Sequence, residues 1–361
     1  MTTRHARRSR LPGLFALLLP IAALAVLGVS CGGGGGDKAG EAGGSAKPAA
    51  RITLGAYTTP REAYGEILPL FKKTWKEQTG QDVTFEESYL GSGAQSRAIC
   101  EGFEADLAAL SLEADIARIA EAGLITHDWK DNPTKGMVST SIVAFAVRKG
   151  NPKGVRDWAD LAKPGLQVLT PNPRTSGGAM WNVLALLGAA RRGYVEGVPA
   201  GDEAAAIEFL RKVLKNVTVM DKGARESITN FEKGVGDVAI TYENEILVGR
   251  DRGLDYDMVI PRSTILIENP AALIDASVDK HKTREATAAL VAFLRGPEAQ
   301  EVFARHGLRS VDAQVAAAHA ARYPPVEDLF TIEHFGGWRE AVPAIFSEQG
   351  IYSRAIGELQ Q

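Results

Sequence analysis

Cysteine and histidine are sparse in this 361-residue sequence, which has only two Cys and six His. The histidines are scattered, and neither a Cys/His spacing typical of a metal site nor an HExxH motif is present. The GxSxG turn of serine hydrolases and the P-loop of nucleotide-binding enzymes are missing as well. These absences leave little support for catalysis by a metal, a nucleophilic serine or a bound nucleotide.

The sequence also lacks an excess of positive charge. Its 41 basic and 44 acidic residues give a formal net charge of −3. The first thirty residues contain four arginines and no acidic residue, so the rest of the chain has 37 basic and 44 acidic residues, a net charge of −7. A net acidic protein does not attract nucleic acid or an anionic membrane through its overall field. The composition, 45% hydrophobic and 24% charged, is that of an ordinary soluble protein with a sizeable core.

The first thirty residues combine a basic start with the apolar run "LPGLFALLLPIAALAVLGVS", and Cys31 follows directly. This order predicts a lipoprotein signal peptide over residues 1–30 with Cys31 as the lipidated residue; an uncleaved transmembrane anchor is the alternative. Residues 31–50 are rich in glycine and predict a flexible tether. Cys100 would then have no cysteine partner, so we expect it to be a buried structural thiol.

Strand and helix patterns alternate along the rest of the chain. Alternating or apolar runs predict strands at 51–57, 82–90, 105–112, 140–152, 166–173, 217–221, 236–245, 255–261 and 265–275. Helical spacing predicts helices at 61–80, 91–103, 113–125, 155–165, 202–216, 223–234 and 283–307. Such alternation is typical of an α/β fold with a mainly parallel sheet and helices on both faces.

Three glycine-rich turns each end a predicted strand and open a helix: "LGSGAQ" (90–95), "RTSGGAMW" (174–181) and "DKGARES" (221–227). The start of a helix has unpaired backbone N–H groups and a partial positive charge, so it can bind an anion without a basic side chain. In open α/β sheets these turns gather at the carboxyl ends of the strands. Taken singly, a glycine-rich turn before a helix is most often only a tight connection, and the three turns do not identify a ligand.

Several longer stretches carry a resemblance to a known family. They are "GSGAQSRA", "VRKGNPKGVRDWADL", "TPNPRTSGGAMWN", "KNVTVMDKGARESITNFEKGVGDVAITYENE", "FLRGPEAQEVFA" and "HFGGW". With these stretches, the chain from about residue 52 onward closely resembles the periplasmic sulfate-binding proteins, the solute receptors of sulfate/thiosulfate ABC importers. The resemblance implies a binding protein rather than an enzyme, with no cofactor.

The resemblance implies a type II periplasmic-binding-protein fold, in which two α/β lobes are joined by two crossing strands and the ligand lies in the cleft. We place the crossings near 139–147 and 239–245. The first lobe would then comprise residues 51–138 plus 246–361, including the C-terminal helices, and the second lobe residues 139–245.

The family holds dehydrated sulfate with neutral donors. Carried over, Thr58 would donate a backbone N–H, and Ser92 both its hydroxyl and its N–H. Gly177 and Gly178 would donate backbone N–H groups to the ligand at the start of the second helix, and Ala224 would donate one at the start of the third. Tyr242, where the family has an indole, would add a phenol donor, and Gly93, Ser176 and Arg225 are possible supporting residues. Arg174 stands near the second turn.

A site made only of donors suits sulfate, which offers only acceptors, whereas phosphate near neutral pH still carries a proton and needs an acceptor. The carboxylates near the turns are Asp221, Glu226 and Glu243. Thiosulfate, molybdate and phosphate remain alternative ligands, and an enzyme or a sensor with the same pocket remains an alternative class. The expected protein is a monomer, lipid-anchored in the periplasm or on the outer face of the cytoplasmic membrane, that serves an importer permease.

Overall fold

The computed structural model describes residues 48–357. The predicted signal peptide, Cys31 and most of the predicted tether therefore lie outside the described residues. Ten strands are joined in one continuous order, β2-β1-β3-β9-β4-β7-β5-β6, with β10 beside β9 and β8 beside β4. The strands are β1 (Ala50–Tyr57), β2 (Val83–Leu90), β3 (Leu107–Ala109), β4 (Met137–Arg148), β5 (Val168–Pro171), β6 (Val217–Asp221), β7 (Val238–Tyr242), β8 (Tyr256–Val259), β9 (Ser263–Leu273) and β10 (Asp328–Phe330).

Helices separate most of the strands, as the alternating sequence pattern predicts. They are α1 (Arg61–Thr79), α2 (Ser92–Cys100), α3 (Glu113–Glu121), α4 (Gly177–Arg191), α5 (Glu203–Lys215), α6 (Ala224–Glu232), α7 (Glu243–Asp251), α8 (Asp275–His281), α9 (Arg284–Arg295), α10 (Pro297–Arg305), α11 (Ala313–Ala318), α12 (Trp338–Ala341) and α13 (Ile351–Gly357). None of the helices within residues 48–357 combines the length and apolar character that a bilayer span requires.

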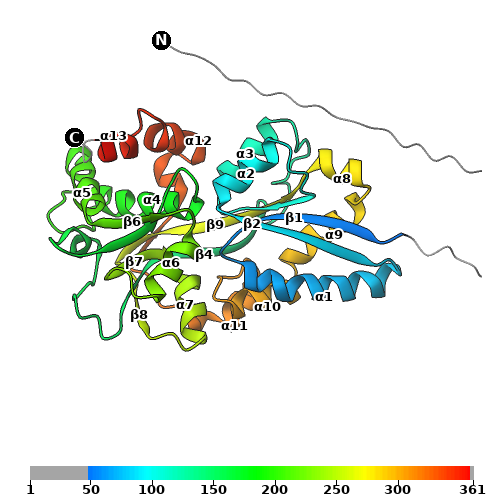
Figure 1. Cartoon of the computed structure of the whole chain (residues 1–361), viewed down its shortest axis with the longest axis horizontal. Helices are drawn as coiled ribbons and strands as arrows, with labels where there is room; N and C mark the ends of the chain where they lie inside the picture. Colours follow the sequence, from blue (N-terminus) through cyan, green and yellow to red (C-terminus); the bar gives the residue numbers. More distant parts are fainter. Residues whose placement is uncertain (1–47, 358–361) are drawn as a thin grey trace, which may run out of the picture. The chain divides into compact units, whose positions relative to one another are not determined.

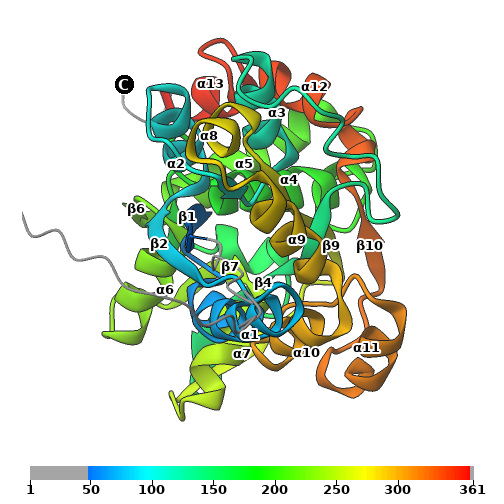
Figure 2. The same cartoon turned by 90° about the vertical axis from the view of Figure 1, so that its right-hand side faces the viewer.

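The first lobe is built on β1, β2 and β3, which pair in parallel. Helix α1 buries a stripe of side chains at helical spacing, Tyr64, Ile67, Leu68, Phe71 and Trp75, and ends at Gly80 in the left-handed conformation (φ 72°). Figure 1 and Figure 2 show α1 on one face of this sheet and α2 with α3 on the other. The helices α8, α9 and α10 belong to the same part, because α9 packs on β1 and α10 on α1.

The second lobe is built on β5, β6 and β7, again in parallel, with α4, α5, α6 and α7 around them. Helix α4 has apolar residues on every side and is buried along nearly its whole length. It packs on β9, β7 and α5. A helix of this kind needs protein on all faces, which places its N-terminal glycines deep in the molecule.

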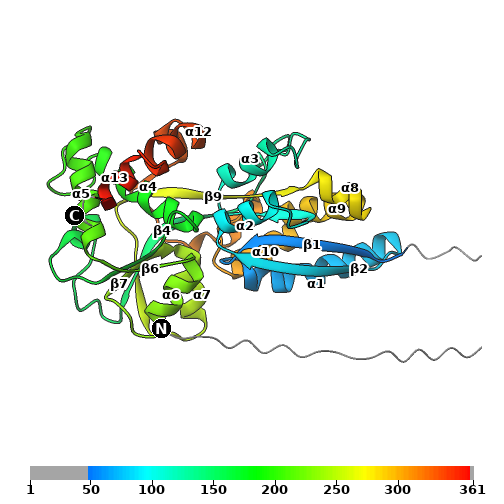
Figure 3. The same ribbon diagram turned by 45° about the horizontal axis from the view of Figure 1, so that its top comes forward.

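Two strands join the lobes. The first, β4, pairs with β9 over Ser139–Ile142 and with β7 over Val143–Val147. The second crossing was expected near 239–245, in the segment that contains β7. Strand β7 pairs only with β4 and β5, whereas β9 pairs with β4 and also with β3 of the first lobe. Figure 3 shows β4 and β9 passing through the middle of the molecule.

The C-terminal helices α12 and α13 pack largely on the second lobe, and α12 also contacts α3 of the first lobe. Trp338 of α12 and Tyr352 of α13 share a hydrophobic core with residues of α4 and α5. The rings of Trp338 and Trp181 meet edge to face, with centroids 4.7 Å apart. Figure 1 and Figure 3 show α13 beside α5 and α12 between α13 and α3. Burial of these aromatic rings decides the placement, because a helix of four or seven residues gains little stability by itself.

His281, the last residue of α8, has two acidic neighbours, Glu104 and Asp106, which directly precede β3. Nδ1 of His281 is 2.9 Å from Oδ1 of Asp106, and Nε2 is 3.1 Å from Oε2 of Glu104. Burial lowers the pKa of His281, but hydrogen bonds with the two carboxylates outweigh burial and leave the pKa above its ordinary value. Asp106 also accepts the N–H of Thr53 in β1 at 2.8 Å, so this cluster ties α8 to the sheet.

The cluster makes the stability of the first lobe dependent on pH. A raised pKa in the folded protein stabilises it fully below the unfolded value, near 6.5, and the contribution is lost as the pH rises through the folded pKa. We therefore expect His281→Gln to lower the free energy of unfolding, and to lower it more at pH 5.5 than at pH 8.5. Urea unfolding at the two pH values measures both differences. An equal difference at both pH values would show that the histidine is not charged in this cluster.

Candidate anion-binding site

The residues predicted from the glycine-rich turns come together around one small cavity between the lobes. It has about 180 Å³ of empty volume and is lined by Tyr57, Thr58, Thr59, Gly91, Ser92, Ser111, Ser176, Gly177, Gly178, Ala224 and Tyr242. The cavity is far smaller than cavities that bind drug-sized ligands, so only a ligand of a few atoms is compatible with it.

Three helix starts meet at this cavity. Helix α2 begins at Ser92, α4 at Gly177 and α6 at Ala224. The turns in front of them touch: a Cβ atom on Gly91 would lie 2.5 Å from the carbonyl oxygen of Thr175 and 3.0 Å from that of Lys222. Glycine at position 91 is therefore required, because any other residue would push the three turns apart.

The amides at these helix starts are unpaired. The backbone N–H groups of Ser92, Gly177, Gly178 and Ala224 donate to no protein acceptor within residues 48–357. The first N–H groups of a helix have no partner in their own helix, and an N-terminus carries partial positive charge. Buried donors of this kind are costly unless something accepts from them, so their convergence indicates an anion as the ligand.

The two glycines of α4 are also fixed by packing. A Cβ atom on Gly177 would lie 2.7 Å from Oγ of Ser111, and one on Gly178 would lie 2.7 Å from the ring of Tyr242. Both distances are shorter than a carbon atom tolerates. The bare backbone therefore serves two purposes: it leaves the amides accessible, and it lets the second-lobe helix approach Ser111 of the first lobe.

The serine hydroxyls differ from expectation. The hydroxyl of Ser92 donates to Oδ2 of Asp115 at 2.6 Å and accepts the N–H of Ser111 at 2.9 Å. Because Asp115 accepts this hydrogen, the predicted donation of the Ser92 hydroxyl to a ligand would require this bond to break, and the donation stays a prediction. Ser176, predicted only as a supporting residue, caps α4 by accepting the N–H of Ala179 at 3.3 Å. Because Ser176 is the acceptor in this bond, its own hydroxyl hydrogen remains available for another acceptor, and Ser176 lines the cavity.

Ser111 was not predicted from the sequence. It follows β3, is 1% exposed, and its Oγ is 2.6 Å from the phenol oxygen of Tyr242. Burial raises the pKa of Tyr242 well above its ordinary value, so the phenol stays neutral. A polar residue at the carboxyl end of an otherwise apolar strand was the one available signal for Ser111. Tyr57, Thr59 and Gly91 line the cavity as well and were likewise missed.

The other supporting residues lie outside the inner cavity. Gly93 is not among the lining residues and packs near Arg97 and Thr175. The carbonyl oxygen of Arg174 accepts from Nη2 of Arg97 at 3.0 Å. This contact joins α2 of the first lobe to the turn before α4, so position 174 fixes the turn through its backbone.

Arg225 connects the lobes by ion pairs. Its guanidinium contacts Glu62 of α1 and Glu245 of α7, and Nη2 donates to the carbonyl oxygen of Thr59 at 3.0 Å. Glu245 is 2% exposed, and burial raises the pKa of its carboxyl group. Arg225 therefore neutralises a buried carboxylate and at the same time ties α6 to the loop that contains Thr58 and Thr59.

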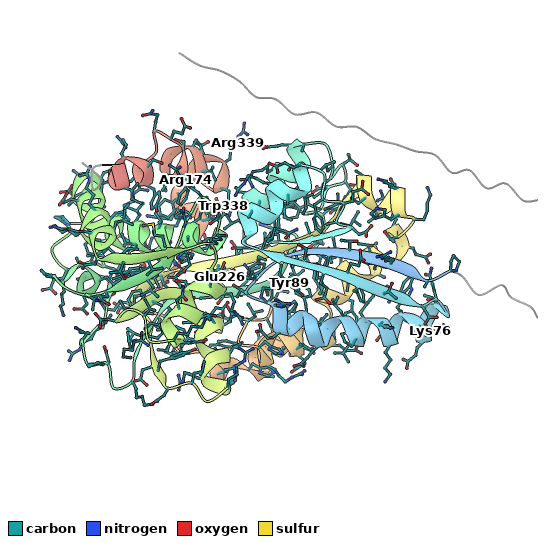
Figure 4. All side chains as sticks on the ribbon, viewed as in Figure 1. Lys76, Tyr89, Arg174, Glu226, Trp338 and Arg339 are labelled. Atoms are coloured by element: carbon teal, nitrogen blue, oxygen red, sulfur yellow. The ribbon has the colours of Figure 1, made fainter. Side chains whose placement is uncertain are left out.

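No carboxylate lines the inner cavity. Asp221 and Glu226 line a larger, open cavity next to it, which shares Thr58 and contains residues of both lobes. Figure 4 shows Tyr89 and Glu226 near the middle of the molecule, where the lobes meet. Glu243 lies elsewhere, paired with Arg309 at 2.7 Å. The inner cavity thus presents neutral groups, most of them donors.

Comparison with known proteins agrees with this geometry. The family model for bacterial extracellular solute-binding proteins matches residues 52–309. The chain is 44% identical over 313 residues to the sulfate-binding protein of Synechocystis sp., with 86% of this chain and 87% of that protein covered. It is 36% identical over 318 residues to the thiosulfate-binding protein of Pseudomonas aeruginosa, with 86% of this chain and 94% of that protein covered.

Among solved structures, the sulfate-binding protein SubI from Mycobacterium tuberculosis is similar, with a TM-score of 0.75 and 37% identity over 82% of this chain and 100% of that chain. This likeness agrees with the type II periplasmic-binding-protein fold that the resemblance implies, with two α/β lobes joined by two crossing strands. These relatives are named as binding proteins and not as enzymes. The chain belongs to the sulfate-binding branch of the bacterial extracellular solute-binding proteins.

Proposed function

We propose that this protein binds sulfate in the inner cavity, through backbone N–H groups at three helix starts, and delivers it to an ABC importer. One observation carries the proposal: the unpaired amides of Ser92, Gly177, Gly178 and Ala224 surround a cavity whose lining contains no carboxylate. A dianion that only accepts hydrogen bonds matches these donors. The names of the relatives support the same ligand.

The side-chain donors differ from those first expected. In this proposal Ser176 donates its hydroxyl, and Ser92 contributes only its backbone N–H, because Asp115 holds its hydroxyl hydrogen. Thr58 contributes a backbone N–H from the first lobe. Tyr242 contributes a phenol that is shared with Ser111.

The location and partners follow from the same proposal. The lipid-modified Cys31 would hold the protein at the outer face of the cytoplasmic membrane or in the periplasm, and the tether over 31–50 would let it reach the permease. A monomer is sufficient, since both walls of the cavity come from one chain. Thiosulfate is the second candidate ligand, because the similar Pseudomonas aeruginosa protein is named for it.

Calorimetric titration of residues 48–361 with sulfate, thiosulfate, molybdate and phosphate tests the ligand. We expect tight binding of sulfate and much weaker binding of phosphate. Hydrogen phosphate places a donor against a donor in this cavity, and one unmatched buried group costs about 1–3 kcal/mol, roughly 5- to 150-fold in affinity. Tight phosphate binding without sulfate binding would reject the proposal.

A further inference from the structure

Ser111 is the residue at which the cavity, both lobes and a crossing strand meet. Its N–H donates to Oγ of Ser92, at the start of α2 in the first lobe. Its Oγ pairs with Tyr242, at the end of β7 in the second lobe. Its carbonyl oxygen accepts Nε1 of Trp181 in α4 at 3.0 Å and Nδ2 of Asn269 in β9 at 3.2 Å. Every polar group of this buried serine is thus engaged.

The bonds made by Ser111 fall into two groups. Those to Tyr242 and Trp181 cross from the first lobe to the second, so separating the lobes has to break them. The bond from Asn269 instead reaches the crossing strand β9. Asn269 lies opposite Ser139 of β4, and Oγ of Ser139 donates to Oδ1 of Asn269 at 3.3 Å. A continuous buried chain of hydrogen bonds therefore runs from the cavity through Ser111 to both strands that join the lobes.

We propose that Ser111 and Asn269 are positioning residues that couple occupation of the cavity to closure of the two lobes. A ligand held by α4 and α6 fixes the second-lobe wall of the cavity against Ser111. The hydrogen bonds of Asn269 to Ser111 and to Ser139 connect this wall to the crossing strands β9 and β4. Loss of the chain lowers the fraction of closed protein, and apparent affinity falls by the same factor. This inference rests on the proposed function for the identity of the ligand only.

Asn269 is the decisive position, because it does not line the cavity. Ser111 does line the cavity, so a substitution there can weaken binding either by breaking the coupling between the lobes or by removing a contact with the ligand. Asn269→Ala removes the bond to Ser111 while leaving the cavity wall intact. Thr264→Ala is the matched control: Thr264 lies on the same strand, is fully buried, and donates to the carbonyl oxygen of Val143 in β4 at 2.8 Å without any link to Ser111.

A second pair of variants covers the case in which Asn269→Ala folds poorly. Trp181→Phe keeps an aromatic ring in place but removes the N–H that reaches Ser111 across the lobes. Ser111→Ala is compared with Ser141→Ala, since Ser141 is buried on β4 and its hydroxyl has no partner within residues 48–357. Each control removes a buried polar group at the crossing strands and leaves the chain through Ser111 unbroken.

Small-angle X-ray scattering during a sulfate titration measures closure and affinity together. For Asn269→Ala and Trp181→Phe we expect the sulfate concentration at half-maximal compaction to rise at least 10-fold, with Thr264→Ala and Ser141→Ala within about 2-fold of wild type. Without ligand, Asn269→Ala should have a larger radius of gyration than Thr264→Ala.

The outcomes separate the two proposals. A wild-type protein whose scattering and heat do not respond to sulfate overturns the proposed function. Wild-type response with unchanged titrations for Asn269→Ala and Trp181→Phe overturns the coupling through Ser111 and leaves the function standing. Equal weakening by Asn269→Ala and Thr264→Ala also overturns it, because any lost bond at the crossing strands would then have the same effect. If wild type does not respond to any anion, equal ligand-free scattering of Asn269→Ala and Thr264→Ala counts against the coupling.

Discussion

Replacing Gly177 with proline should weaken sulfate binding by about 100-fold relative to replacing it with alanine. Both substitutions add a Cβ atom that meets Oγ of Ser111 at 2.7 Å. Only proline also removes the backbone N–H, and a hydrogen bond to a charged group contributes about 1.5–3 kcal/mol, roughly 10- to 150-fold in affinity. The comparison therefore isolates the amide from the steric cost that both variants share.

Helix α4 should tolerate the proline. Gly177 is the first residue of the helix, where proline is common, and Ser176 before it is extended (φ −115°, ψ 122°), as a residue before proline prefers. Thermal unfolding checks that both variants remain folded, and calorimetry gives their affinities for sulfate. Equal affinity of the proline and alanine variants would show that this amide does not touch the ligand.

Arg225→Met should destabilise the protein by about 3–5 kcal/mol at neutral pH, because it leaves the buried carboxylate of Glu245 without its cation. Burial already raises the pKa of Glu245, and without Arg225 it should rise further. A carboxyl group with a raised pKa in the folded state loses its stabilising effect as the pH rises through that pKa. The difference in free energy of unfolding between wild type and Arg225→Met, measured by urea unfolding, should therefore be smaller at pH 5 than at pH 8.

Two companion variants make this result specific. Adding Glu245→Gln to Arg225→Met removes the buried charge and should recover most of the lost stability. Lys76→Met breaks an exposed pair with Asp82 at the far end of α1 (Figure 4) and should change stability by less than about 1 kcal/mol. If the double variant is no more stable than Arg225→Met alone, the loss comes from packing rather than from the buried charge.

The local features of the site were predictable from the sequence. A glycine-rich turn in front of an apolar helix is a signal contained within about eight residues, and it identified the starts of α2, α4 and α6 correctly. All three begin at residues that the resemblance assigned to the ligand, namely Ser92, Gly177 and Ala224. Helix capping is decided by neighbouring residues, so such signals survive in a single sequence.

Contacts between distant segments were not predictable in the same way. Strand β9 was recognised as a strand, but only its pairing with both β3 and β4 makes it a crossing strand. The docking of α12 on the second lobe depends on Trp338 meeting Trp181, more than 150 positions away in the chain. The engagement of the Ser92 hydroxyl by Asp115 likewise requires α3 to be in place. The lobe boundaries expected from the sequence remain a prediction.

The neutral lining of the inner cavity has a consequence for where this protein works. A receptor outside the cytoplasmic membrane is exposed to whatever acidity its surroundings have. No side chain that gains or loses a proton near neutral pH lines the cavity, and burial keeps the phenols of Tyr57 and Tyr242 protonated. Under the proposed function, capture by peptide dipoles instead of lysine, arginine or histidine would make sulfate binding insensitive to external pH near neutrality.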